Sequence, residues 1–412
     1  MVLVLLARNP TDSVTHGLLP AADRLGLAVR VLTDDPHAHR AVYQALHQES
    51  GYRQPAVEGC SVTEVRAVLA ALAGTRPTAL LSNSDHLQTQ TALVAEYFDR
   101  PGKDWRSAIR ARDKGLMRAT LRQAGLDDTT FLRIRAIAAD HELDDVHFPA
   151  VLKPAEGVAS EDVVLVRDRN ELDRRIAQIR AHRDGDLLVE SLLDGPLHTL
   201  ETLGDGTTIR VWGGYQTRVS PAPHFIEERL TWQPAQSTRS TRSEAVVNTV
   251  LAQLAALGVG FGPCHTEFIL TAAGPRIVEV NDRLIGDHAD FLMADLLAEP
   301  VFEDVIGVHL GQPPRAAPQQ PGRRRGLVHS VVAQTDGTLI SEPGRVARTW
   351  EGQHQQDGVQ LDYWPMRQPG TTIRITGTNR DYLGTIRVTG PDDTAIEAAT
   401  DEFLTSQRWV IG

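Results

Sequence analysis

The sequence HTEFILTAAGPRIVEVNDR, residues 265–283, holds two short runs of alternating apolar residues separated by small turn residues. A loop at residues 272–274 gives a three-residue hairpin, in which the glycine supplies the positive φ that such a turn needs. In this register Glu267 lies directly opposite Glu279 on the neighbouring strand. The stretch therefore predicts a hairpin that sets two carboxylates face to face.

The same register fixes the rest of the hairpin. It pairs Thr271 with Pro275 and His265 with Asn281. Because side chains alternate between the two faces of a strand, we expect one polar face and one apolar face. The polar face carries His265, Glu267, Glu279 and Asn281, and the apolar face carries Phe268, Leu270, Val278 and Val280.

Two facing carboxylates need a positive partner. Directly opposed strand residues have Cβ atoms about 4.5–5.5 Å apart, and like charges at that separation destabilise a sheet. Glu267, Glu279 and Asn281 offer the oxygen ligands that suit Mg²⁺, or Mn²⁺ in its place. The alternative is that Arg276 and Arg283 neutralise the pair on a solvated hairpin. The hairpin alone leaves both interpretations open.

Length, charge and cysteine content limit the class of protein. A chain of 412 residues and 45.1 kDa suits about two to four domains. A net charge of −11 argues against a nucleic-acid partner, because phosphate backbones attract basic surfaces. Cys60 and Cys264 show no ligand-like spacing, so neither a disulfide framework nor a zinc site is expected. No apolar run is long enough to span a membrane, and the first residues do not resemble a signal peptide. We expect a soluble, cytoplasmic protein with no membrane partner.

Residues 1–104 alternate short apolar runs with helical segments. Strands are predicted at 2–7, 28–33 and 78–83, and helices at 18–26, 62–74 and 89–98. This βαβαβα order predicts a Rossmann-like domain, a parallel sheet with helices on both faces. The turn after the first strand lacks GxGxxG, so dinucleotide binding is not expected.

The rest of the chain has a different order of predicted strands and helices. Residues 105–313 mix strands with helices predicted at 112–125 and 243–258, and residues 314–412 predict a small α+β domain. A Pro- and Arg-rich connection lies between them at residues 314–326. Its composition indicates a solvated linker. The predicted fold class is thus α/β and α+β, with several domains.

Two segments of the middle region suit a nucleotide. Lys153 ends a strand and precedes a loop containing Gly157 and Ser160, where small residues let backbone N–H groups approach phosphate oxygens. An ordinary β-turn would explain this segment equally well. A second apolar strand emerges at 190–192 and turns at 194–195, which offers main-chain groups to an adenine edge.

The order of these motifs resembles the ATP-grasp superfamily of carboxylate–amine ligases. The matching elements are Asp113-Lys114, Val151-Leu152-Lys153-Pro154, the Gly/Ser loop, Val189-Glu190-Ser191-Leu192, Glu267, and Glu279-x-Asn281-x-Arg283. The resemblance implies a central domain of two α+β subdomains that hold ATP between them, with a lid subdomain at about 112–190. Relatives of this kind are often homodimers, which we also expect here.

The resemblance also implies roles for the matching residues. The metal would be Mg²⁺ held by Glu267, Glu279 and Asn281. Catalysis would rest on Arg283, Lys153 and Lys114. The residues expected to contact ATP are Lys114, Lys153, Gly157, Ser160, Glu190, Ser191, Leu192 and His198.

The segment 215–235 resembles the P-x-F-x-E segment of L-amino-acid ligases, the dipeptide-forming branch, and of the formate-dependent purine transformylase. The C-terminal domain resembles the closing domain of the same ligases. This branch implies substrate contacts from Glu227, His265, Gly286 and Asp287. For His265, a plain hydrogen bond to a carboxylate is an equal alternative to substrate contact. For Glu227, a position on the protein surface is an equal alternative.

Three departures from the family pattern stand out. The glycine-rich loop ends in Glu161-Asp162, where relatives carry a glycine. The acid that contacts ribose is replaced by Leu197, which leaves His198 or Glu201 for that role. The region around Gly286, next to the expected acyl-substrate pocket, also differs.

The function implied is an ATP-dependent ligase that joins an amino acid or small acid to an amine through an acyl phosphate. One alternative is an enzyme of the superfamily that uses formate or bicarbonate on a nucleotide or cofactor. Another is a nucleotide-binding regulator without turnover, which the altered loop at 161–162 and Leu197 favour.

Overall fold

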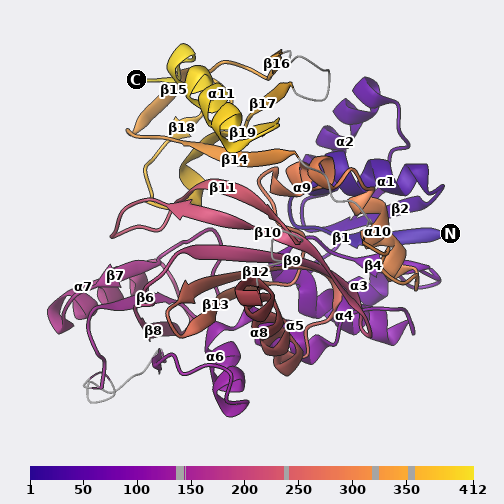
Figure 1. Ribbon diagram of the computed structural model, residues 1–412. Coiled ribbons are helices and arrows are strands. Elements are labelled where there is room, and N and C mark those ends of the chain that lie inside the picture. Colours follow the sequence, from indigo (N-terminus) through magenta and orange to yellow (C-terminus); the bar gives the residue numbers. More distant parts are fainter. Residues whose placement is uncertain (136–142, 144, 236–240, 318–323, 351–357) are drawn as a thin grey trace.

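The computed structural model describes the chain except residues 136–142, 144, 236–240, 318–323 and 351–357, which are grey in Figure 1. The described part contains an N-terminal parallel sheet, a nine-stranded central sheet, a four-stranded lid sheet and a small three-stranded sheet. This mixed α/β and α+β architecture confirms the predicted fold class.

The N-terminal sheet is parallel, with the strand order β3-β2-β1-β4. Alternate residues of β1 enter two different apolar cores, so helices cover both faces as predicted. The strands are β1 (Val2–Leu6), β2 (Ala28–Thr33), β3 (Ala56–Gly59) and β4 (Ala79–Leu81). The helices are η1 (Ser13–Leu18, a π-helix), α1 (Leu19–Arg24), α2 (Pro36–Ser50), α3 (Val65–Ala71), η2 (Asp85–Leu87, a 3₁₀ helix) and α4 (Gln88–Tyr97).

The sequence prediction missed β3 and α2. The β3 strand lies at the sheet edge and buries none of its residues fully. The α2 helix buries only His39, Tyr43 and Leu46, so its apolar stripe is too narrow to show a helical period.

The central sheet carries the predicted hairpin. Its order is β13-β12-β9-β10-β11-β14-β19-β17-β16. Helices α6 and α8 pack on the apolar face of the β12–β13 hairpin, where Met117, Leu254 and Ile277 share one core. The elements are α5 (Trp105–Arg112), α6 (Lys114–Gln123), β9 (Leu197–Asp205), β10 (Ile209–Val219), β11 (Glu227–Pro234), α8 (Thr241–Leu257), β12 (Phe261–Thr271), β13 (Gly274–Asn281), α9 (Ala289–Leu297) and α10 (Val301–His309).

The turn of the hairpin differs from the prediction by one residue. Thr271 pairs with Gly274, not with Pro275, and a bulge opposite Glu267 and Phe268 then restores the predicted register. Gly274 has the expected positive φ of 109°. The bulge removes Val278 from the apolar face, where we had predicted it, and Ile277 enters the core instead.

The lid sheet is antiparallel, with the order β5-β8-β6-β7. Its elements are β5 (Phe131–Ile134), β6 (Ala150–Pro154), β7 (Val164–Val166), α7 (Arg169–Arg180) and β8 (Leu187–Ser191). The strand order places Lys153 of β6 beside β8, which carries Glu190.

The C-terminal region continues the central sheet. β14 pairs with β11, so the sheet crosses the predicted domain limit at 313/314, and the three domain ranges stay predictions. The elements are β14 (Arg325–Val332), β15 (Gly337–Ser341), β16 (Val346–Trp350), β17 (Val359–Pro365), β18 (Thr372–Ile373), η5 (Asn379–Asp381, a 3₁₀ helix), β19 (Tyr382–Gly390), α11 (Asp393–Ser406) and β20 (Val410–Ile411). Among the described residues, no helix has the length and apolar character needed to cross a membrane.

Candidate active site

The facing carboxylates are present in the structure. Glu267 of β12 pairs with Glu279 of β13, and His265 pairs with Asn281, as the sequence predicted. On its other side β12 pairs with β9, which places Glu201 beside His265. The acidic face therefore belongs to three adjacent strands and not to an isolated hairpin, so the sheet holds the two glutamates together.

The amide of Asn281 meets carboxylate oxygens at both ends. One end lies 3.3 Å from Glu267 Oε1. The other lies 3.3 Å from Glu279 Oε1 and 3.2 Å from Asp85 Oδ1. In either orientation the amide oxygen faces a carboxylate, which is unfavourable without a cation between them. These oxygens fit Mg²⁺.

The candidate metal site depends on that amide. Within the described ranges, no group of three or more His, Cys, Asp or Glu side chains is arranged to hold a metal ion. Two carboxylates and one amide leave room for waters and phosphate oxygens, which Mg²⁺ commonly retains.

Two cations partly offset the acidic pair. Lys114 Nζ lies 3.1 Å from Glu279 Oε1, and His265 Nε2 lies 3.3 Å from Glu267 Oε1. His265 Nδ1 also lies 2.8 Å from Glu201 Oε1. Burial disfavours the imidazolium, but Glu201 and Glu267 outweigh it and raise the pKa of His265 to about 10. His265 thus hydrogen-bonds two carboxylates, which agrees with the interpretation offered as the alternative to substrate contact.

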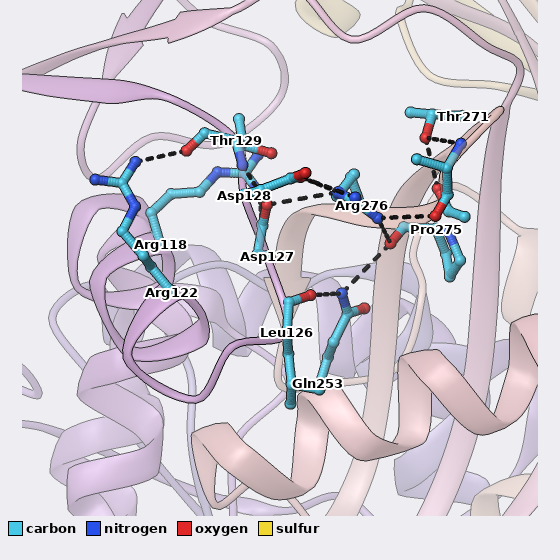
Figure 2. Close-up of polar contacts among 12 residues, drawn as sticks. Arg118, Arg122, Leu126, Asp127, Asp128, Thr129, Gln253, Thr271, Pro275 and Arg276 are labelled. Atoms are coloured by element: carbon cyan, nitrogen blue, oxygen red, sulfur yellow. Dashed lines mark hydrogen bonds and ion pairs between the residues drawn. The ribbon is translucent and has the colours of Figure 1, made fainter.

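The structure places Arg276 away from the acidic pair. Figure 2 shows Arg276 reaching Asp127 and Asp128, and the shortest of these contacts is 2.8 Å, to Asp128 Oδ1. Gln253 of α8 links the same region by donating to Leu126 O at 3.0 Å. The interpretation in which Arg276 neutralises the two glutamates is therefore wrong.

Arg283 is held by the N-terminal domain. Its Nε lies 2.8 Å from Asp85 Oδ2, and its Nη1 donates to Leu284 O at 2.6 Å. Asn83 Oδ1 accepts from Leu284 N at 3.1 Å, which ties the same turn to the end of β4. In the part of the chain that the structure describes, Arg283 Nη2 has no such partner. Arg283 can therefore donate to a bound substrate without leaving Asp85.

Asp85 is a candidate site residue that the sequence prediction missed. Asp85, Glu279, Asn281 and Arg112 line one small pocket. Burial alone would raise the pKa of Asp85, but Arg283 lowers it overall. Asp85 is separated from Arg283 by 198 positions, so only the position of Asp85 just after an apolar strand could have suggested it.

Lys153 and Glu190 form a buried ion cluster. Lys153 Nζ lies 2.7 Å from Glu190 Oε2, and Arg118 Nε lies 2.9 Å from Glu190 Oε1. Arg118 also lies 2.5 Å from Asp127. Burial lowers the pKa of Lys153, with Glu190 opposing that effect. Glu190 thus contributes its side chain to this cluster, and its predicted contact with ATP stays a prediction.

The segment that follows β8 is more open. Ser191 N donates to Thr130 O at 3.0 Å, and Leu192 N lies 3.5 Å from Pro149 O. The Leu192 side chain is 40% exposed. Leu192 therefore offers apolar surface beside the lid, as contact with an adenine ring requires.

The loop between β6 and β7 lies against two cations. Gly157 O accepts from Arg112 at 3.1 Å and from Lys114 at 3.4 Å. Ala159 and Ser160 have φ values of 57° and 56°, and Asp162 has 58°, a left-handed conformation that residues other than glycine rarely adopt. Residues 155–163, called the phosphate loop here after their predicted role, thus form a constrained segment next to Lys114.

Glu227 and Asp287 lie near the acidic pair without partners of their own. Among the described residues, neither carboxylate makes a hydrogen bond or ion pair. Burial raises the pKa of Glu227, and Glu267, Asp287 and Glu279 raise it further, to about 8. Asp287 is exposed and follows the half-buried Gly286. These positions suit contact with a cationic substrate group.

His198 is not brought to this cluster. It pairs with Phe268 across β9 and β12, and the two rings stack at 5.8 Å. Phe268 belongs to the apolar core, so His198 lies on the face opposite Glu267. Of the two residues predicted for ribose contact, Glu201 is the one that shares the acidic face.

Comparisons with known proteins show which family the chain resembles. An ATP-grasp domain family matches residues 146–290. The "Uncharacterized protein y4rH" of Sinorhizobium fredii is 31% identical over 347 residues, covering 80% of this chain and 67% of that protein. Carnosine synthase 1 of Gallus gallus is 27% identical over 219 residues, covering 49% of this chain and 22% of the synthase.

The whole chain also has a counterpart among solved structures. The L-amino acid ligase from Bacillus licheniformis superposes with a TM-score of 0.77 at 22% identity, covering 100% of this chain and 98% of that one. The protein described here belongs to the ATP-grasp family.

Proposed function

We propose that this protein is an ATP- and Mg²⁺-dependent ligase of small-metabolite biosynthesis. It would join the carboxylate of an amino acid, or of another small acid, to an amine or a second amino acid. The observation that carries the proposal is the convergence of Glu267, Glu279 and the Asn281 amide, with Arg283 directly after them. L-amino acid ligase and carnosine synthase 1, by their names, support the same substrate class.

Bound Mg²⁺ and ATP would supply the phosphoryl group and the positive charge that the facing carboxylates lack. Glu267, Glu279 and Asn281 would hold the cation. Lys114 lies beside the pair, and Lys153 lies on the lid strand, so both can face phosphate oxygens. Such catalysis depends on positioning and charge stabilisation more than on covalent work by the protein.

The chemistry proceeds in two steps. The substrate carboxylate attacks the γ-phosphorus, ADP leaves, and an acyl phosphate forms. The amine then attacks the acyl carbon, loses a proton and expels phosphate. Arg283 Nη2 would donate to phosphoryl oxygens in the first step and to the oxyanion formed at the acyl carbon in the second, because its Nε and Nη1 are already engaged. Glu227 would accept the ammonium group of an amino-acid substrate.

A matrix of carboxylic acids against amines tests the proposal. Purified protein receives MgATP, phosphate release is measured, and products are identified by mass spectrometry. ADP formation that needs both an acid and an amine supports the ligase. Turnover with formate or bicarbonate on a nucleotide or cofactor would instead indicate a formate- or bicarbonate-using enzyme of the same superfamily. Nucleotide binding without turnover in every well would favour a regulator.

Two further expectations belong to the same proposal. We place the enzyme in the cytoplasm, where ATP and amino acids are available. We also propose a homodimer, which light scattering on the purified protein would test.

A further inference from the structure

The phosphate loop is attached to the C-terminal region. Glu161 forms an ion pair with Arg380, and Asn379 N donates to Ala159 O at 3.1 Å. Glu161 and Asp162 also pair with Arg183 of the lid, at 3.0 and 2.7 Å. The acids that depart from the family pattern are therefore engaged in ion pairs that hold this loop.

The C-terminal side of this contact is rigidly built. Asp381 is 4% exposed, and its carboxylate accepts from the backbone N–H groups of Thr376 and Gly377, at 2.9 and 2.7 Å. Thr378 and Asp381 complete a reciprocal capping box around η5. Residues 376–381 thus present Asn379 and Arg380 in a fixed position.

Asn379 also contacts the substrate side of the site. Its Oδ1 accepts from Glu227 N at 3.0 Å, and Tyr382 donates through its hydroxyl to Glu227 O at 2.6 Å. One short segment, residues 379–382, therefore contacts both the phosphate loop and the residue that the proposed function assigns to the substrate ammonium group.

We propose that Arg380 and Asn379 are positioning residues that hold the phosphate loop closed over ATP and couple this closure to the substrate-binding Glu227. The inference rests on the proposed function for the role of Glu227. The physical reason is that the loop has a strained backbone at Ala159 and Ser160, which persists only when neighbouring groups hold it. Closure keeps water from the acyl phosphate, so about one ADP would be released for each amide product formed.

Hydrogen exchange of residues 155–163, with and without Mg²⁺ and a non-hydrolysable ATP analogue, tests the contact without requiring turnover. Arg380→Gln and Glu161→Gln should each speed exchange of the analogue-bound loop about two- to fivefold, the range that a part-exposed ion pair supports. The double variant should be no faster than Glu161→Gln alone, because that change already removes the ion pair with Arg380 as well as the one with Arg183. Arg380→Lys should restore part of the protection.

Arg374→Gln is the matched control, because Arg374 is exposed on the preceding segment and has no ion pair or hydrogen bond among the described residues. It should behave as the wild type. Equal exchange in Arg380→Gln and wild type, or additive effects in the double variant, would overturn the contact.

Coupling is measured once an active acid and amine pair is known. Asn379→Ala should raise the ratio of ADP to amide product at least about twofold, while its thermal midpoint stays near that of the wild type. An unchanged ratio would overturn the coupling to Glu227. If no acid and amine pair is turned over, the proposed function fails, whereas the exchange experiment still decides the loop contact.

Discussion

Glu190 is buried and Glu227 is half-buried, and the two glutamates have opposite electrostatic surroundings. Burial disfavours the charge of Glu190, yet Lys153 and Arg118 lower its pKa to about 2. Burial raises the pKa of Glu227, and neighbouring carboxylates raise it further, to about 8. In the cluster around Glu190 the carboxylates of Glu190 and Asp127 are paired with cations of the protein, while the cluster around Glu227 has more acid than cation. That difference makes the second cluster the better candidate for binding a cationic ligand.

The largest expected effect comes from the acid-rich cluster near Glu227, which includes Glu279. Glu279→Ala should lower turnover at least about 10³-fold, because a metal ion that offsets phosphoryl charge is worth several kcal/mol. Steady-state ADP release measures the loss. Arg276→Gln, a change on the same strand away from the pair, should keep nearly full activity. Full turnover by Glu279→Ala would contradict the metal assignment.

A mutation in the cluster around Glu190 should lower the stability of the protein. Arg118→Met removes a cation that lies 2.9 Å from Glu190 and 2.5 Å from Asp127, and leaves both carboxylates undercompensated in the interior. We expect a loss of about 3–5 kcal/mol in the free energy of unfolding. Urea unfolding followed by circular dichroism measures it. An unchanged midpoint would show that this cluster does not stabilise the lid.

Arg283→Ala should lower kcat about 10²–10³-fold, by analogy with the loss of one oxyanion donor. Asp85→Asn keeps Arg283 in place but weakens its orientation, so we expect a smaller loss of about tenfold, a difference of about 1.4 kcal/mol. Rates at saturating ATP and substrates measure both. Equal losses in the two variants would mean that Asp85 does more than orient Arg283.

The smallest expected effect concerns the pH dependence of stability. The pKa of Glu227 is raised from 4.5 to about 8, so between these values the folded chain binds more protons than the unfolded chain. Stability from this group is therefore lost as the pH rises through that window. Glu227→Gln should unfold at the same temperature as wild type near pH 4.5, and a few degrees higher above pH 8. Calorimetry that finds a constant difference would refute the raised pKa.

The sequence predicts the hairpin register because alternation and a glycine turn act over few residues. Glu267, Glu279, His265 and Asn281 face one another as expected, although the turn is one residue shorter and a bulge at Val278 compensates. The shorter turn and the bulge each shift the pairing of β13 by one residue, and the two shifts cancel. The polar face of β12 is also in register with β9.

Long-range contacts could not be predicted in the same way. The contact of Asp85 with Arg283 joins separate domains, and the sequence holds no local signal for it. The face on which His198 lies follows from its pairing with Phe268, which requires knowing that β9 is the neighbour of β12. The ion pairs of Glu161 depend on residues from the lid and the C-terminal region.

The central claim is that the facing glutamates hold a divalent cation together with a nucleotide. A crystal structure with Mn²⁺ and ADP, using anomalous scattering to locate the metal, tests it most directly. We predict a manganese peak within direct coordination distance of carboxylate oxygens of Glu267 and Glu279 and of the Asn281 amide oxygen, next to the β-phosphate. Nucleotide bound in the lid with no metal between these side chains would contradict the account.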